Sequence, residues 1–156
     1  MRFEILAAGS QQPAWVSAGF EEYRKRLPRE CRLALTEIRL GARRKPGDVE
    51  RAVAGEGKRM LAALRDAAHV VALDVAGRTF STAALAREFE NWLAAGRDVA
   101  FLIGGPDGLA PDCLARAQLK WSLSALTLPH GLVRVIVAEQ LYRAWTILHG
   151  HPYHRG

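Results

Sequence analysis

The last residues of the chain carry its densest group of side chains that could do chemistry. They are three histidines, a tyrosine and an arginine: His149, His151, Tyr153, His154 and Arg155. Tyr153 can stack on a nucleic-acid base, His154 can exchange a proton near neutral pH, and Arg155 can hold a phosphate. Because neither a carboxylate nor a thiolate stands beside the histidines, we expect no metal site here. A solvated basic end of the chain is the alternative.

A glycine pair, Gly104 and Gly105, follows an almost wholly apolar stretch at residues 98–103. Glycines at the end of a buried strand let a ligand approach the backbone closely. The segment matches neither the dinucleotide-binding pattern nor the P-loop pattern, and no lysine follows it to hold phosphates. We therefore do not expect a nucleotide triphosphatase. A tight turn without a ligand is the alternative.

Residues 124–129 form an uncharged, weakly polar segment that ends at a proline. Such a segment offers backbone N–H and C=O groups within an apolar lining. This combination suits a flat, neutral heterocycle such as adenine, bound through backbone groups at its edges and apolar contacts on its faces. Ordinary core packing is the alternative interpretation.

The last helix, expected over residues 131–148, places one arginine in an apolar environment. On a helical projection its polar side carries Glu139, Gln140, Arg143 and Thr146. Arg134 lies opposite them, among Ala138, Leu141, Trp145 and Leu148. An unpaired buried guanidinium is strongly disfavoured, so Arg134 needs either an internal ion pair or an arriving phosphate or carboxylate. Since the helix is apolar almost all round, it also indicates a subunit interface.

These candidate residues must be positioned by regular elements, and the periodicity predicts five strands that alternate with helices. The expected strands cover residues 2–8, 32–40, 69–74, 98–103 and 121–126. The expected helices cover residues 13–27, 48–64, 82–95, 111–117 and 131–148, with Ser81 or Thr82 as the cap of the third. The alternation predicts an α/β fold with a mostly parallel sheet and helices on both faces. Without a repeat or linker, residues 1–156 form one predicted domain.

In such a sheet, ligands bind outside the carboxyl ends of the strands. Three strand ends therefore matter most: Leu73 and Asp74, the glycine pair after residue 103, and residues 124–129.

Composition limits the classes of protein that need to be considered. The chain has 156 residues, a net charge of +6 and a pI of about 9.9, which mildly favours a polyanionic partner. Basic residues gather at 24–26, 29 and 43–45. The apolar stretches are too short for a membrane span, and no signal peptide is evident. Cys31 and Cys113 lie far apart, so we expect reduced thiols and a cytoplasmic protein.

Several segments together resemble one known family over nearly the full length. They are ILAAG at 5–9, FEEY at 20–23, EG at 56–57, LD at 73–74, LIGGPDGL at 102–109, LSALTLPH at 123–130, Arg134, EQLYRAW at 139–145 and HPYH at 151–154. The chain resembles the RlmH family, small SPOUT-class methyltransferases that modify large-subunit ribosomal RNA. The two longest motifs are specific in combination, whereas either alone would be weak.

The resemblance implies a SPOUT-type α/β fold with a C-terminal trefoil knot, an exception to the usual absence of knots. It implies S-adenosyl-L-methionine as cofactor, in contact with Leu73, Gly104, Gly105, Leu123, Ser124, Ala125, Leu126, Thr127 and Leu128. It further implies a homodimer whose active sites are completed across the interface. The implied substrate is a pseudouridine in a loop of 23S rRNA within the assembled ribosome, methylated on N3.

The implied reaction assigns catalytic roles to four side chains. The N3 atom carries a proton that must be accepted before or during methyl transfer. His154 is the first candidate acceptor and Tyr153 the second, and Arg134 and Arg143 would hold phosphate, the cofactor carboxylate or charge on the base. Two alternatives remain at this point: a ribosome-binding protein without enzymatic activity, and a SPOUT methyltransferase that acts on tRNA.

Overall fold

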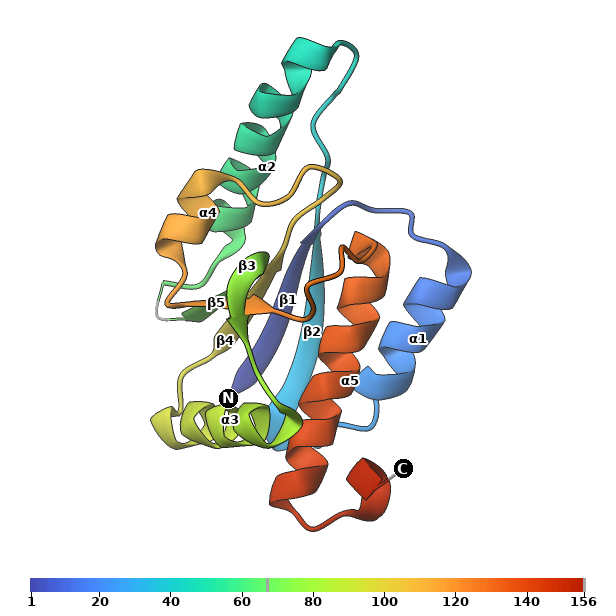
Figure 1. Ribbon diagram of the computed structural model, residues 1–156, viewed down its shortest axis with the longest axis vertical. Helices are drawn as coiled ribbons and strands as arrows, with labels where there is room; N and C mark the ends of the chain where they lie inside the picture. Colours follow the sequence, from blue (N-terminus) through green and yellow to red (C-terminus); the bar gives the residue numbers. More distant parts are fainter. Residues whose placement is uncertain (67, 156) are drawn as a thin grey trace.

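The computed structural model describes residues 1–66 and 68–155; Gly156, the last residue of the predicted tail, lies outside them. Figure 1 shows a twisted sheet of five strands between two layers of helices. The strands are β1 (Arg2–Ala8), β2 (Arg32–Ile38), β3 (His69–Thr79), β4 (Val99–Ile103) and β5 (Leu119–Ser122). The helices are α1 (Ala14–Arg24), α2 (Val49–Ala63), α3 (Thr82–Ala95), α4 (Pro111–Arg116) and α5 (His130–Leu148), with short 3₁₀ turns at Arg29–Cys31, Pro46–Asp48 and Pro152–Arg155.

The strand order is β2-β1-β4-β3-β5, and every ladder between these strands is parallel. Parallel neighbours need crossover connections, which places a helix after most strands and covers both faces of the sheet. The predicted α/β class with a mostly parallel sheet is therefore confirmed. The C-terminal knot stays a prediction.

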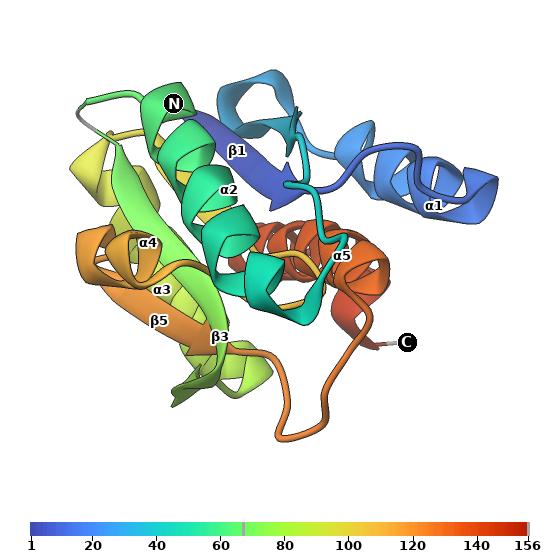
Figure 2. The ribbon, with the colours of Figure 1, turned by 90° about the horizontal axis from the view of Figure 1, so that it is seen from above.

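The two faces of the sheet carry separate hydrophobic cores because side chains along a strand alternate between them. Phe3 and Ile5 of β1 point toward α1, α3 and α5, and belong to the larger core. Leu6, the residue that follows Ile5, points to the opposite face and packs with Met60 of α2 and Cys113 of α4. Figure 2 shows α2 and α4 on one side of the sheet and α5 on the other.

The helix boundaries follow local signals that the sequence contains. Ser81 caps α3, where its Oγ accepts a hydrogen bond of 3.1 Å from the backbone N–H of Ala84. Gly96 ends the same helix in the left-handed conformation, with φ of +69°. Both ends lie where the sequence predicts them.

Two strands differ from the prediction. The last strand is β5 (Leu119–Ser122), so the prediction of residues 121–126 is wrong, and residues 123–129 form a loop. Two serines favour this loop, because Ser122 Oγ donates to the Ser124 carbonyl at 3.0 Å and Ser124 Oγ accepts from Leu126 N–H at 3.0 Å. Strand β3 extends to Thr79 rather than residue 74, with a shift in register between Leu73 and Arg78 against β5.

In the described residues, no helix is long and apolar enough to cross a membrane, and no group of ligating side chains could hold a metal ion. Cys31 and Cys113 are both buried free thiols.

Candidate active site

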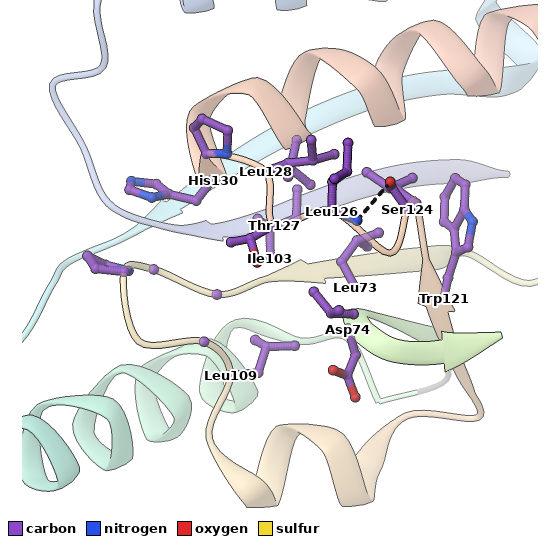
Figure 3. A pocket seen from close by; sticks show the side chains of 18 of the residues that line it. Leu73, Asp74, Ile103, Leu109, Trp121, Ser124, Leu126, Thr127, Leu128 and His130 are labelled. Atoms are coloured by element: carbon purple, nitrogen blue, oxygen red, sulfur yellow. Dashed lines mark hydrogen bonds between the residues drawn. The ribbon is translucent and has the colours of Figure 1, made fainter. Parts of the chain in front are cut away.

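A cavity of about 560 Å³ opens beside the middle of β3 and the carboxyl end of β4, next to β5 and the first turn of α5. Figure 3 shows its wall of leucine side chains together with Ile103 and Trp121. Eight of the nine residues predicted to contact the cofactor line this cavity: Leu73, Gly104, Gly105, Leu123, Ser124, Leu126, Thr127 and Leu128. Ala125 is not among its lining residues. The topology therefore gathers three segments that lie far apart in the sequence.

The floor of the cavity is a tight turn at residues 104–108. Gly108 N–H donates to the Gly105 carbonyl at 3.1 Å, and Gly108 has a φ of +82° that disfavours any side chain. A Cβ on Gly104 would lie 2.4 Å from the carbonyl carbon of Gly108. The turn itself therefore requires glycine at 104, and its exposed backbone forms part of the cavity wall.

The loop of residues 123–129 forms the opposite wall. Leu126, near its tip, exposes 71 % of its surface, although it also contributes to the cavity. The bond from Ser124 Oγ fixes the turn that precedes this leucine, as drawn in Figure 3. The wall is consequently largely apolar, and two serine hydrogen bonds hold it in shape.

Two titratable side chains line the cavity: Asp74 at the end of the predicted third strand, and His130 at the first turn of α5. Asp74 Oδ1 accepts a hydrogen bond of 3.2 Å from the backbone of Ala76. Burial, and then the positive charge of Arg134, lower the pKa of His130. A neutral imidazole and the Asp74 side chain, together with the hydroxyl groups of Ser124 and Thr127, therefore supply the polarity of a largely apolar site.

A second group of polar residues combines two residues of the C-terminal tail with residues of α1 and α5. We name it the tail cluster, and it consists of Tyr23, Glu139, Arg143, Tyr153 and His154. Tyr153 Oη donates to Glu139 Oε2 at 3.0 Å and lies 3.4 Å from the hydroxyl of Tyr23. Arg143 pairs with Glu139 at 3.0 Å and lies over the ring of Tyr153, 5.1 Å from its centroid. The Nδ1 atom of His154 is buried without a hydrogen-bond partner.

The tail cluster holds its tyrosine in the protonated form. Burial, together with the hydrogen bonds to Tyr23 and Glu139, raises the pKa of Tyr153. A phenol with a raised pKa donates a hydrogen bond at neutral pH and is a poor proton acceptor. Among the two predicted acceptors, this environment favours His154.

Arg134 occupies neither the cavity lining nor the tail cluster. Its side chain is almost fully buried, and its guanidinium pairs with Glu37 at 2.7 Å and donates to the Gly9 carbonyl at 2.8 Å. The internal ion pair is thus present, and it ties α5 to the ends of β1 and β2. A direct catalytic role for Arg134 stays a prediction.

The cavity is lined by the first turn of α5, whereas the C-terminal 3₁₀ turn follows the far end of this helix, as the ribbon in Figure 1 shows. Val133 lines the cavity, whereas Arg143 belongs to the tail cluster. Tyr153 reaches back to Glu139, which lies about 9 Å farther along the helix than Val133, and no residue of the tail cluster is among those that line the cavity. One copy of the chain therefore does not bring its predicted catalytic tail to its own cavity.

Sequence reasoning missed several residues of these two groups. Asp74 and His130 line the cavity; both belong to segments identified from the sequence, a strand end and the LSALTLPH motif, but neither of them was assigned a role in the site. Glu139 organises the tail cluster, and its signal was the i, i+4 spacing to Arg143. Thr146 was expected on the polar side of the helix, but it is fully buried and its hydroxyl donates to the Arg143 carbonyl at 2.6 Å.

Comparison with known proteins agrees with this architecture. A family model described as "Predicted SPOUT methyltransferase" matches residues 1–154. The chain belongs to the SPOUT methyltransferases. Its relatives include the "Ribosomal RNA large subunit methyltransferase H" of Methylococcus capsulatus, 56 % identical over 99 % of this chain and 100 % of the relative. The protein of the same name from Alkalilimnicola ehrlichii is 57 % identical over 99 % of both chains.

A solved structure supports the SPOUT fold. The putative methyltransferase Lpg2936 from Legionella pneumophila, whose structure is described as a complex with bound SAM, superposes with a TM-score of 0.53. It is 9 % identical, and the match covers 92 % of this chain and 66 % of the other. At this identity, the likeness extends to the fold.

The cavity of this SPOUT chain fits S-adenosyl-L-methionine in chemical character. Apolar walls and exposed backbone groups suit the adenine ring, and Asp74 offers a carboxylate for ribose hydroxyls. The glycine turn adds a surface without side chains, where a Cβ on Gly104 would displace the backbone. The residues present therefore fit the cofactor of the family.

Proposed function

We propose that this protein transfers a methyl group from S-adenosyl-L-methionine to N3 of a pseudouridine in large-subunit ribosomal RNA, within the assembled ribosome. The observation that carries the proposal is the cavity at the strand ends, formed by the segments that the RlmH resemblance assigns to the cofactor. Relatives of 56–57 % identity named as large-subunit rRNA methyltransferases support the choice of substrate. A ribosomal substrate is consistent with the expected cytoplasmic location.

The cofactor is held by the three segments around the cavity. The lining residues of the 123–128 loop and the leucine side chains would hold the adenine, and Asp74 would offer a carboxylate to the ribose hydroxyls. The turn at Gly104 and Gly105 leaves space for the remainder of the molecule. When bound, S-adenosyl-L-methionine supplies an electrophilic methyl group on a sulfonium. The apolar walls exclude water from the reacting atoms.

The side chains of the tail cluster act on the RNA base that receives the methyl group. His154 accepts the proton from N3, and the protonated Tyr153 donates a hydrogen bond or stacks on the base. Arg143, already oriented by Glu139, stabilises negative charge that develops on the base or binds phosphate. Arg134 contributes indirectly, because its pair with Glu37 fixes the start of α5 beside the cavity.

A homodimer brings these two halves together. Since the tail lies at the far end of α5 from the cavity, each complete site requires a cavity from one protomer and the tail of its partner. The faces of α5 that its own chain leaves partly exposed are largely apolar and include Leu132, Ile136 and Ile147. Such residues suit a subunit interface.

The test uses ribosomes from cells that lack this protein. Mass mapping of their rRNA should show one pseudouridine without its methyl group, and purified protein with S-adenosyl-L-methionine should restore it on ribosomes better than on naked rRNA. His154→Ala should slow single-turnover methylation while cofactor affinity stays close to unchanged. Absence of cofactor binding by titration calorimetry, in a folded dimer, would instead indicate a ribosome-binding protein. Methylation of tRNA in place of rRNA would contradict the substrate.

A further inference from the structure

We propose that the loop between β2 and α2, together with the outer side of α2, binds the phosphate backbone of the RNA substrate. This surface, which we name the basic face, consists of the exposed side chains Arg39, Arg44, Lys45, Arg51 and Lys58. It extends the proposed function by locating where the RNA lies on the protein. Figure 1 shows the loop and the start of α2 at the end of the molecule where β1 and β2 end.

Charge is concentrated in this segment. Residues 39–59 contain seven lysines and arginines but three acids, so they carry +4 of the chain's net +6. Two of the three acids are engaged inside the protein: Glu56 is buried against Arg43, and Asp48 accepts hydrogen bonds from the backbone of Arg44 and Lys45. Within the described part of the chain, the five side chains of the basic face make no ion pair.

The other basic run of the sequence has a different environment. Arg24, Lys25 and Arg26 all form ion pairs with Glu21 or Glu22 on the same helix. Two acids compensate two of the three positive charges locally, so this run attracts a polyanion more weakly than the basic face does. The structure thus separates two runs that look alike in the sequence.

The basic face is joined directly to the proposed cofactor cavity. Arg43, within the loop, pairs with buried Glu56 at 2.6 Å and with Asp107 at 2.7 Å. Asp107 belongs to the glycine turn that forms the cavity floor, and a Cβ on Gly105 would lie 3.0 Å from Leu40 in the same loop. RNA bound on the basic face is therefore held next to the place where the methyl group is delivered.

The composition of the basic face favours RNA over an acidic protein. Protein interfaces depend on aromatic and aliphatic anchors in a desolvated centre. The exposed residues of this segment include no aromatic side chain, and Leu40 is its one exposed large apolar residue, at 37 %. Long, mobile cations without such an anchor are typical of phosphate contacts.

The experiment compares two variants that each lose three exposed cations. The test variant is Arg44→Ala/Lys45→Ala/Arg51→Ala. The control, Arg29→Ala/Arg32→Ala/Arg87→Ala, removes exposed arginines near the opposite end of the sheet and on α3. Affinity for ribosomes that lack the methyl group is measured over a series of salt concentrations, and affinity for S-adenosyl-L-methionine is measured by calorimetry.

At a salt concentration of about 0.1 M, we expect the test variant to bind ribosomes at least about tenfold more weakly than the wild type. The slope of log K against log salt concentration should be smaller in magnitude by about two. The control should keep a slope close to that of the wild type, and both variants should keep cofactor affinity. Unchanged ribosome affinity in the test variant would overturn the inference. Weaker binding with an unchanged slope would also overturn it, because the lost contact would then be with a protein. Failure of the proposed function is recognised separately, since the wild-type protein would then not methylate ribosomes.

Discussion

At the scale of single residues, the contacts of Arg134 distinguish a structural role from a catalytic one. Its guanidinium is enclosed by Glu37 and the Gly9 carbonyl, and its Nε atom is buried without a partner. Replacing it removes a buried side chain and the partner of Glu37. These contacts connect α5 to the sheet, and they favour a structural role for Arg134 over the binding of a ligand.

We therefore expect Arg134→Ala to lower the free energy of unfolding by about 2 kcal/mol or more, because it removes a buried side chain together with its bonds to the exposed Glu37 and to the Gly9 carbonyl. Urea unfolding followed by circular dichroism measures this loss. Arg143→Ala is the matched comparison, since its partly exposed pair with Glu139 should cost about 1 kcal/mol or less. Full stability of Arg134→Ala together with lost methylation would contradict the structural role and favour the catalytic one.

His69 gives the protein a defined response to pH. Burial, and then the charge of Arg97, lower the pKa of His69 in the folded state. The unfolded chain then binds the proton more readily than the folded one, so stability is greatest when this histidine is neutral. It falls as the pH drops below the ordinary histidine pKa of about 6.5.

We expect the unfolding free energy of the wild type to decrease between pH 7.5 and pH 5.5, and His69→Asn to reduce that decrease. Urea titrations at the two pH values measure both differences. His149→Asn serves as the comparison, because His149 is exposed and should leave the pH dependence as it is. An identical decrease in the wild type and His69→Asn would show that other groups cause it.

At the scale of elements, the loop of residues 123–129 is shaped by two serine hydrogen bonds, and one of them comes from a side chain within the loop. Ser124 Oγ accepts from Leu126 N–H at 3.0 Å and sets the turn beside the cavity. The loop has no ladder partners of its own, so this contact has a large share in fixing its shape.

Ser124→Ala should weaken S-adenosyl-L-methionine binding by about threefold to tenfold, because a neutral hydrogen bond contributes about 1 kcal/mol. Titration calorimetry measures the affinity, and thermal unfolding should change little. Ser81→Ala should behave in the opposite way: it removes the cap of α3 and costs about 1 kcal/mol of stability without an effect on the cofactor. Equal effects of the two serines on affinity would argue against a specific role for the loop.

Periodicity and capping residues predict most elements of this fold because they act within a few residues. Ser81 and Gly96 bound α3 as expected, and the buried stretch at residues 99–103 forms β4. The extension of β3 beyond Asp74 could not be seen in this way. It depends on Gly77, where a Cβ would lie 2.6 Å from the backbone of Lys120 in the neighbouring strand β5. Such a close approach is a property of the assembled sheet.

In the candidate site, too, local motifs were predictable from the sequence and contacts between distant elements were not. Gly104 and the leucines of residues 123–128 were identified by motif, and the parallel topology explains why these segments meet. The location of Arg134 remained open between two alternatives, since its partner Glu37 is distant in sequence and belongs to another strand. Predicting which side chains of two distant elements pair requires the tertiary structure. Predicting where a strand ends requires little more than the local sequence pattern.

At the scale of the whole molecule, α5 separates two groups that the proposed reaction requires together. The cavity lies at its first turn, and the tail cluster begins at Glu139, about 9 Å farther along the helix than Val133. Either the tail leaves its contacts and moves to the cavity, or a partner subunit supplies it. The contacts of Tyr153 with Tyr23 and Glu139 hold the tail in place on its own chain, which favours the second arrangement.

A heterodimer experiment separates these two arrangements. One protomer carries Gly104→Val, which disrupts the cavity floor because a side chain there meets the backbone of Gly108. The other carries His154→Ala, and the pair is purified through two different affinity tags. If cavity and tail come from different protomers, one of the two sites has both parts intact, and single-turnover methylation should reach about half the wild-type amplitude. The reciprocal heterodimer places both changes in one protomer beside a wild-type partner, and then neither site is intact. Shared sites thus predict activity in the first heterodimer and its loss in the second, whereas sites formed within one chain predict the reverse, so the two amplitudes together decide which subunit supplies the tail.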